Sequence, residues 1–261
     1  MKIRYVLANP TENRTVLVTC AVADAQKQEV AARLMRLETT AEQLGFVDLD
    51  APTLQMAGGE FCGNASMSAA ALYAREKRRL VSGQTEKVVL SASGALYPIS
   101  ATVAREGEAY ICSVEMPRPL SISAVTLPLE GGGVRLPAVR FAGITHLICE
   151  NEIDRETAEA QIRFWCRELG ADALGIMFLS EEKQRLTPLV YVPGAGTLFW
   201  ESSCAGGTTA YGAWQYARTG KPFSGTLTEP GGSLSVFADK ERLTLSGKVV
   251  FEKEAEIEIG S

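Results

Sequence analysis

The chain lacks the features that identify membrane, secreted and nucleotide-binding proteins from sequence alone. No apolar run approaches the roughly 20 residues that span a bilayer, and residues 1–10 (MKIRYVLANP) are too short and too interrupted for a secretory signal. The glycines at 131–133 lack the strand–turn–helix context of a dinucleotide- or phosphate-binding loop. A net charge of −5 and a pI near 5.2 disfavour nucleic acid and anionic membranes as partners. We therefore expect a cytoplasmic protein that binds neither.

The chain also lacks closely spaced cysteine pairs and has a single histidine. The six cysteines, at positions 20, 62, 112, 149, 166 and 204, form no CxxC pair, and His146 is the single histidine. A zinc site usually draws three or four ligands from such residues, so no metal is expected. A disulfide framework is typical of small secreted chains, so we expect reduced thiols. A Cys–His nucleophile pair and a redox pair remain open as alternatives.

Glycine-rich surroundings distinguish two of the six cysteines. Cys20, Cys112 and Cys149 lie in apolar, strand-like runs and are interpreted as small buried hydrophobic residues. Cys62 instead stands in GGEFCGNASMSAAA, and Cys204 stands in ESSCAGGTTA; in both, a run of very small residues follows the thiol. We therefore place the candidate site at these two segments.

Composition and periodicity predict an α+β protein. The chain has 261 residues, 46% of them hydrophobic and 22% charged, which is an ordinary globular balance that can bury a large core. The patterns predict helices near 24–38, 62–77 and 155–169 and after Cys204, and strands near 3–8, 15–21, 45–49, 53–57, 87–92, 97–103, 109–115, 122–127, 143–149, 174–179, 186–192, 197–200, 234–238, 242–246 and 248–258. Pro117 and Pro119 mark a boundary. The predicted halves are 1–116, completed by 250–261, and 117–249.

The two cysteine segments resemble each other, which indicates an internal duplication. GNASMSAAALYAR follows Cys62 and AGGTTAYGAWQYAR follows Cys204, so each thiol precedes a small-residue helix that ends in Tyr-Ala-Arg. About 30 residues after each cysteine comes a further matching piece, SGALYPI at 93–99 and GGSLSVF at 231–237. Chance similarity of two Ala/Gly-rich helices is the alternative. We expect two pseudo-symmetric halves, each a sheet curled around its small-residue helix.

Two thiols at two helix N-termini favour proton transfer at a carbon next to a carboxylate. A helix N-terminus binds anions through its unsatisfied N–H groups and its partial positive charge. The same field favours the thiolate. If both helices face one cleft between the halves, their amides hold the carboxylate while one sulfur removes the α-proton and the other returns a proton. The amides then stabilise the developing negative charge.

These residues resemble the diaminopimelate epimerase fold superfamily, which includes cofactor-independent amino-acid racemases. EFCGNA is similar to the first cysteine motif of that family and ESSCAGG to the second. The chain most resembles the histidine racemases of staphylopine-type metallophore synthesis, through ANPTENRTVLV (8–18), AEQLGFVD (41–48), MAGGEFCGNASMS (56–68), LVYVPGAGTLFWESSC (189–204) and EPGGSL (229–234). The resemblance implies the diaminopimelate epimerase-like fold and a histidine racemase that needs no cofactor.

The resemblance also implies site residues. Cys62 and Cys204 become the proton-transfer pair. The carboxylate cradle comprises Gly63, Asn64, Gly206 and Gly207, and Ala205 is a further substrate-binding or supporting residue. Two departures are present: Gly59 stands where those racemases carry asparagine, and Ala205-Gly206-Gly207 replaces their Gly-Ser-Gly, which removes a hydroxyl near the carboxylate.

Four further residues have implied roles and simpler alternatives. His146, in THL, takes the place of the family's motif histidine, the alternative being a satisfied strand residue. Glu201 is expected to orient groups in the site, or else to be a solvated loop carboxylate. Glu42 is expected to bind the substrate side chain, or else to lie on the surface. Asn13 is expected in the cleft wall, or else to form a turn.

Other functions remain open on the sequence alone. A racemase or epimerase of another amino acid, diaminopimelate included, is one alternative, although 194–203 contains no arginine for a distal carboxylate. A non-catalytic amino-acid- or opine-binding protein of the same fold is another, favoured by the altered 205–207 segment. The oligomeric state is also open, with a homodimer as one arrangement.

Overall fold

The computed structural model describes residues 1–259, which form two compact units. Unit 1 comprises Met1–Glu115 and the chain from Ser246 onward, and unit 2 comprises Met116–Leu245. Both units combine sheets with few helices, so the protein is of the α+β class. Within the described residues, no helix has the length and apolarity needed to cross a membrane.

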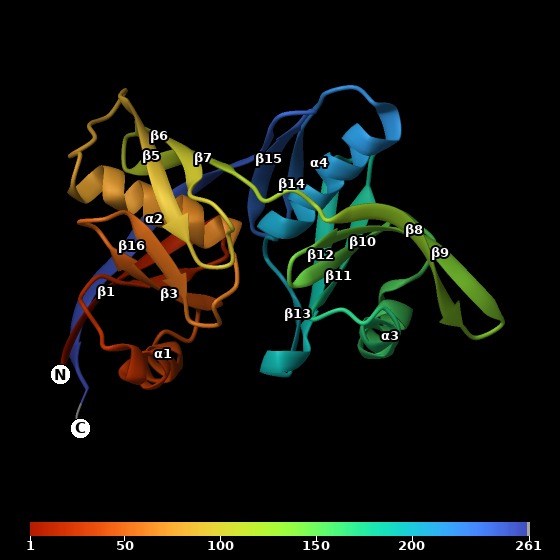
Figure 1. Ribbon diagram of the computed structural model, residues 1–261, viewed down its shortest axis with the longest axis horizontal. Helices are drawn as coiled ribbons and strands as arrows, with labels where there is room; N and C mark the ends of the chain where they lie inside the picture. The colour runs from red at the N-terminus through yellow and green to blue at the C-terminus, as the bar shows by residue number, and fades with distance from the viewer. Residues whose placement is uncertain (260–261) are drawn as a thin grey trace. The chain divides into compact units, whose positions relative to one another are not determined.

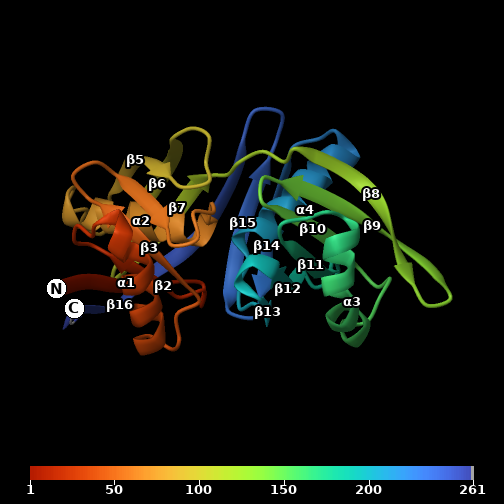
Figure 2. The ribbon, with the colours of Figure 1, turned by 60° about the horizontal axis from the view of Figure 1, so that its bottom comes forward.

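The strands of unit 1 close into a β-barrel (Figures 1 and 2). They follow one another in the sheet as β1 (Lys2–Pro10), β2 (Thr15–Val18), β3 (Gln43–Asp48), β4 (Thr53–Met56), β5 (Thr85–Ala92), β6 (Ile99–Glu106), β7 (Ala109–Glu115) and β16 (Leu243–Glu258). The barrel closes because β1 also pairs antiparallel with β16, from Lys2 opposite Glu258 to Pro10 opposite Val249. Strand β16, from the C-terminal part of the chain, thereby closes the barrel against the first strand, β1.

Helix α2 (Gly63–Glu76) runs through this barrel, as Figure 1 shows. Its small residues explain the position, because a helix of alanine and serine fits where bulkier side chains would force the strands apart. Ala69, Ala70 and Ala71 are all buried, and α2 contacts β1, β2, β4, β5, β6 and β7. Helix α1 (Asp24–Leu37) packs through Val30 and Leu34 against the β1–β3 part of the sheet. The fold therefore buries most of the helix that follows Cys62.

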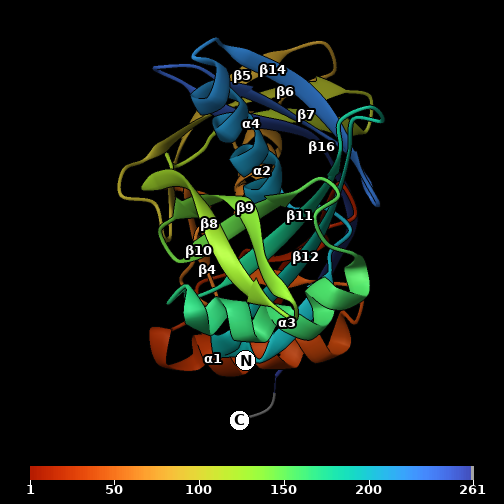
Figure 3. The ribbon, with the colours of Figure 1, turned by 90° about the vertical axis from the view of Figure 1, so that its right-hand side faces the viewer.

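Unit 2 is a sheet with one helix on each face. Its strands run in the order β8 (Ser121–Leu129), β9 (Gly132–Phe141), β10 (Ile144–Cys149), β11 (Leu174–Ser180), β12 (Arg185–Val192), β14 (Phe223–Glu229) and β15 (Gly232–Ala238), with β13 (Thr197–Trp200) paired to β12 after the short 3₁₀ helix Pro193–Ala195. Helix α3 (Arg155–Glu168) packs on one face through Ile162 and Trp165 (Figure 3). Helix α4 (Ala205–Thr219) packs on the other through Ala210 and Tyr211.

Both units repeat one topology, as the sequence duplication predicts. In unit 1, β2 and β3 are parallel and joined through α1, and β4 and β5 are parallel and joined through α2. In unit 2, β10 and β11 are parallel and joined through α3, and β12 and β14 are parallel and joined through α4. A parallel pair needs such a crossover connection. The cysteine-bearing helix is therefore the second crossover of each unit.

Most predicted elements are present, with three differences. Strand β9 was not predicted, because the glycines at its start indicate a loop, yet it pairs with β8 from Gly132 to Arg140. Strand β14 was not predicted either, because Gly225 weakens its alternating pattern. The two strands predicted near 242–246 and 248–258 are one continuous strand, β16, in which Gly247 causes no break. In each case, pairing with neighbouring strands overrides local propensity.

Candidate functional site

Cys62 occupies the N-cap position of α2. Its backbone is extended (φ −130°, ψ 117°), and its Sγ accepts a hydrogen bond from the Ala65 amide at 3.4 Å. The preceding turn is held by Ser93, whose hydroxyl donates to the Glu60 carbonyl (2.8 Å) and accepts from the Met56 amide (2.9 Å). Together these bonds fix the half-buried thiol at the start of the helix.

Cys204 occupies the same position on α4. Its backbone angles are similar (φ −128°, ψ 99°), and its Sγ accepts from the Gly207 amide, also at 3.4 Å. The preceding turn is again held from a later hairpin, because the Gly231 amide donates to the Ser202 carbonyl at 2.8 Å. The matching pieces at 93–99 and 231–237 thus share a role: each supports the residue two positions before a cysteine.

Glu229, at the end of β14, lies under the Cys204 turn and was not identified from the sequence. Its carboxyl group accepts hydrogen bonds from the Cys204 amide (2.6 Å) and from the Thr208 hydroxyl. Only 2% of the residue is exposed, and this burial raises the pKa of the carboxyl to about 8. Unit 2 therefore carries a titratable group at the base of its cysteine, whereas the matching position of the duplication in unit 1 is Ser91.

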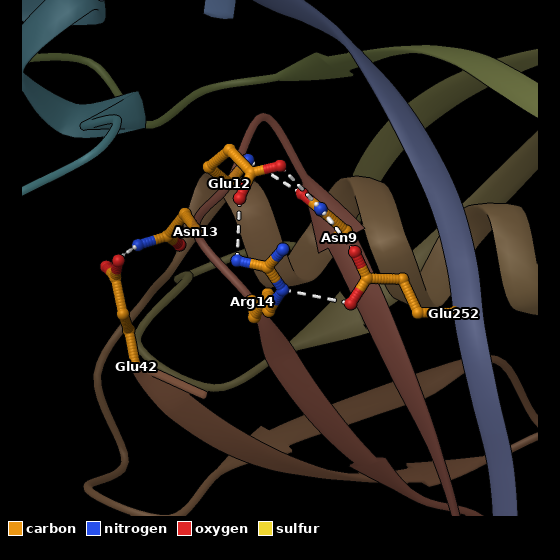
Figure 4. A network of polar contacts seen from close by, with 6 residues as sticks. All are labelled: Asn9, Glu12, Asn13, Arg14, Glu42 and Glu252. Carbon is orange, nitrogen blue, oxygen red and sulfur yellow. Dashed lines mark hydrogen bonds and ion pairs between the residues drawn. The ribbon is translucent and has the colours of Figure 1, made fainter. Parts of the chain in front are cut away.

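In unit 1, Cys62 is connected to Glu42 by a chain of side chains. The thiol donates to Gln43 Oε1 at 3.0 Å, and Gln43 Nε2 donates to Asn13 Oδ1 at 2.6 Å. Asn13 Nδ2 in turn donates to a Glu42 carboxylate oxygen at 2.5 Å (Figure 4). The structure thus brings together three residues expected in the site, and it adds Gln43, which the sequence did not indicate.

His146, on β10, lies against the first turn of α4. A Cβ at Gly206 would stand 2.7 Å from its Nε2, and a Cβ at Gly175 would stand 2.5 Å from its Nδ1. The ring is almost fully buried, and neither nitrogen has a hydrogen-bond partner among the described residues. Burial lowers the pKa of the imidazole to about 4, so the ring is neutral at pH 7. The absence of a side chain at Gly175 and Gly206 therefore makes room for the imidazole ring, and a Cβ at either position would collide with it.

Both cysteines are protonated thiols at neutral pH. Burial raises the pKa of Cys62 to about 11, and the Ala65 amide and the Gln43 side chain offset part of that effect. The pKa of Cys204 is also raised, first by burial and then by the negative charges of Glu201 and Glu229. Burial outweighs the helix N-termini in both units, so ionisation of either thiol needs further stabilisation, from a positive charge or from an added hydrogen-bond donor.

The expected site residues form two clusters, one in each unit. The cluster in unit 1 contains Cys62, Gly63 and Asn64 at the α2 N-terminus together with Asn13 and Glu42. The cluster in unit 2 contains Cys204, Ala205, Gly206 and Gly207 at the α4 N-terminus together with His146 and Glu201. Each cluster presents a helix N-terminus that suits an anion and a thiol beside it. No group of three or more His, Cys, Asp or Glu side chains within the described part of the chain could hold a metal ion.

Comparison with known proteins places the chain among racemases. A family model described as the histidine racemase CntK N-terminal domain matches residues 2–257. A histidine racemase of Fusobacterium nucleatum is 28% identical over 264 residues, which cover 98% of this chain and 96% of the relative. A histidine racemase of Staphylococcus aureus is 27% identical over 248 residues, which cover 90% and 88%.

A solved structure has the same fold. The hydroxyproline epimerase from Agrobacterium vitis, determined with bound trans-4-hydroxy-L-proline, matches with a TM-score of 0.72. The match covers 98% of this chain and 92% of the epimerase, at 10% sequence identity. At that identity the likeness concerns the fold.

Proposed function

Because the chain belongs to the histidine racemase family and is an isomerase of the amino-acid racemase class, we propose that it interconverts L- and D-histidine with Cys62 and Cys204 as the two proton-transfer groups. The observation that carries this proposal is the repeated geometry: each thiol is the N-cap of a small-residue helix and accepts an amide hydrogen bond at 3.4 Å. The proposal includes a fold of the diaminopimelate epimerase-like type with two pseudo-symmetric halves.

Substrate binding begins with the carboxylate. Amides in the first turn of each helix, such as those of Gly63 and Gly206, point toward an anion at the helix N-terminus, where the dipole also favours negative charge. The substrate's α-ammonium group brings the positive charge that the buried thiols lack. As it enters, one thiol loses its proton to solvent and becomes the thiolate.

Racemisation then takes two proton transfers. The thiolate removes the Cα proton and becomes a thiol, and the electron pair left on Cα delocalises into the carboxylate, which the helix amides stabilise. The opposite thiol donates its proton to the other face of Cα and becomes a thiolate. One turnover inverts the carbon and exchanges the protonation states of Cys62 and Cys204. No redox change and no cofactor enter this balance.

Selection for histidine is assigned to the side-chain end of the site. Glu42 ends the hydrogen-bonded chain from Cys62 and retains exposed surface. A carboxylate there accepts a hydrogen bond from an imidazole N–H. A site that is built to pair a polar group rejects substrates that leave it unpaired, so selection is expected to be sharp. The proposal also places the enzyme in the cytoplasm, with D-histidine as a precursor for metallophore synthesis.

A second candidate is a binding protein of the same fold without turnover. The observation that favours it is the segment from Ala205 to Gly207, which has no hydroxyl at the presumed carboxylate site. Incubation with histidine in heavy water separates the two. The racemase exchanges the Cα proton for deuterium and yields both enantiomers on a chiral column, without added pyridoxal phosphate or metal. Binding measured by calorimetry without any deuterium at Cα would refute the racemase proposal.

A further inference from the structure

The hydrogen-bonded chain between Glu42 and Cys62 has a fixed direction. A carboxylate only accepts hydrogen bonds, so the Asn13 group facing Glu42 must be its NH₂. Asn13 Oδ1 is then the acceptor facing Gln43, which must present its own NH₂. Gln43 Oε1 is left to face Cys62, and it accepts only if the sulfur carries a proton. An ionised Glu42 at one end therefore corresponds to a protonated thiol at the other.

A second contact, with Thr15, independently supports the same order of hydrogen-bond donors and acceptors from Cys62 to Glu42. Its hydroxyl donates to the Asn13 carbonyl at 3.2 Å, so its oxygen accepts the second N–H of Gln43 at 2.9 Å. Strand pairing brings these groups together, because Thr15 stands opposite Gln43 in the parallel pair of β2 and β3. The Glu42 amide also donates to the Arg14 carbonyl at 2.9 Å. The order of donors and acceptors thus follows from the backbone register.

The turn that carries Asn13 is strained and separately supported. Thr11 and Glu12 both have left-handed backbones (φ 59° and 63°), which favour glycine or asparagine and are costly for these residues. The network in Figure 4 stabilises the turn: Asn9 Oδ1 accepts from the Glu12 amide at 2.7 Å, and Arg14 bridges Glu12 (2.6 Å) and Glu252 (2.9 Å). Asn9, Glu12, Arg14 and Glu252 thus stabilise the turn that positions Asn13.

We infer that Asn13 and Gln43 are positioning residues that couple the protonation state of Glu42 to that of Cys62. When Glu42 gains a proton, its O–H donates to Asn13 Oδ1, and both amides turn over. Gln43 Nε2 then donates to Cys62 Sγ and stabilises the thiolate. No proton travels along the amides; the proton on Glu42 comes from solvent, and the proton of Cys62 leaves to solvent or substrate. The inference rests on the proposed function in taking Cys62 as a reacting thiol.

Other charges near the chain act through space. Arg14 and Glu12 lie near Glu42, and burial is the largest cause that raises the pKa of the Glu42 carboxyl. The Glu60 carboxylate raises the pKa of the Cys62 thiol by its charge, and Glu60 is not a member of the hydrogen-bonded chain. Glu60 therefore offers a matched control for Glu42: both are acidic, but only Glu42 is linked to the thiol by hydrogen bonds.

A double-mutant cycle in the full-length protein tests the coupling. The readout is the pH midpoint of Cys62 alkylation by iodoacetamide, followed by mass spectrometry of the Cys62 peptide. A glutamine at position 42 can donate or accept, so it no longer fixes the direction of the hydrogen bonds in the chain. Glu42→Gln is therefore expected to lower the pH midpoint of Cys62 alkylation by about one pH unit, which is roughly a tenfold decrease in the proton affinity of the thiol. In a Gln43→Leu background the same substitution is expected to have less than about a third of that effect. Glu60→Gln is expected to lower the midpoint equally in both backgrounds.

An equal shift from Glu42→Gln with and without Gln43 would show through-space action and overturn the inference. If Gln43→Leu does not fold, Asn13→Ala interrupts the chain one link earlier and completes the cycle. Alkylation does not require turnover, so the two proposals can fail separately. Coupling without racemisation would contradict the proposed function alone, and racemisation with equal shifts would contradict the coupling alone.

Discussion

Glu229 is expected to make the protein less stable in alkaline solution. Burial raises the pKa of its carboxyl from an ordinary 4.5 to about 8, so the folded state holds this proton more tightly than the unfolded state. The contribution to the free energy of unfolding is therefore complete below pH 4.5 and is lost progressively as the pH rises through about 8. Since each tenfold difference in proton affinity corresponds to roughly 1.4 kcal/mol, the loss between about pH 5 and pH 8.5 is about 4 kcal/mol.

Glu229→Gln removes the titration and keeps an acceptor for the Cys204 amide. The variant is expected to be close to wild type in stability at about pH 5 and more stable by a few kcal/mol at about pH 8.5. Urea unfolding followed by the fluorescence of the three tryptophans measures both values. His146, whose pKa burial lowers from 6.5 to about 4, also changes the stability between these pH values, but it does so equally in both proteins and cancels in the comparison. The exposed Glu182→Gln serves as the control and should match wild type throughout.

The two outcomes are easily distinguished. If wild type and Glu229→Gln differ by the same free energy at both pH values, the carboxyl does not hold its proton in the folded state. A lower pH midpoint of Cys204 alkylation in the variant would provide a second check, because the Glu229 charge raises the pKa of that thiol.

Four further predictions concern the site. Cys62→Ser and Cys204→Ser should each abolish racemisation, because a hydroxyl is far too weak an acid to replace the thiol; near-normal turnover in either would remove that cysteine from the mechanism. Oxidation should inactivate the enzyme by linking these two thiols, and a reductant should restore it; peptide mapping that finds both free would contradict this. Glu42→Ala should lower histidine turnover at least tenfold in a chiral assay, unless another amino acid is preferred. Gly206→Ala should cost about 1–3 kcal/mol, because its Cβ would stand 2.7 Å from the buried imidazole, whereas Gly194→Ala meets open space.

The helices that bear the two thiols were predictable because their signals are local. A cysteine followed by glycine or alanine and then a run of small residues specifies both the N-cap and the buried helix, and the repetition of the pattern marks the duplication. Val30 and Leu34 likewise recur at helical spacing and pack α1 on its sheet.

Gln43 and Glu229 could not be predicted from the sequence because their roles depend on long-range pairing. Gln43 reaches Cys62 only because the parallel pairing of β2 and β3 places it opposite Thr15. Glu229 reaches the Cys204 amide across 25 residues, from the end of strand β14, whose local pattern does not predict a strand. An acidic or amide residue in a sequence carries no sign of which backbone group it meets once the sheet has formed.

The pairing of β1 with β16 has a consequence for the order of events during synthesis. Lys2 lies opposite Glu258, and the amino group of Met1 donates to the Ile259 carbonyl at 2.7 Å. The ribosome therefore completes all of unit 2 before the strand that closes the unit 1 barrel emerges. Until then, Arg75 at the end of α2 lacks its contacts with Glu254 and Phe251, and contacts this distant in sequence form slowly. The first half of the nascent chain is thus most exposed to proteases and oxidants until β16 has been made.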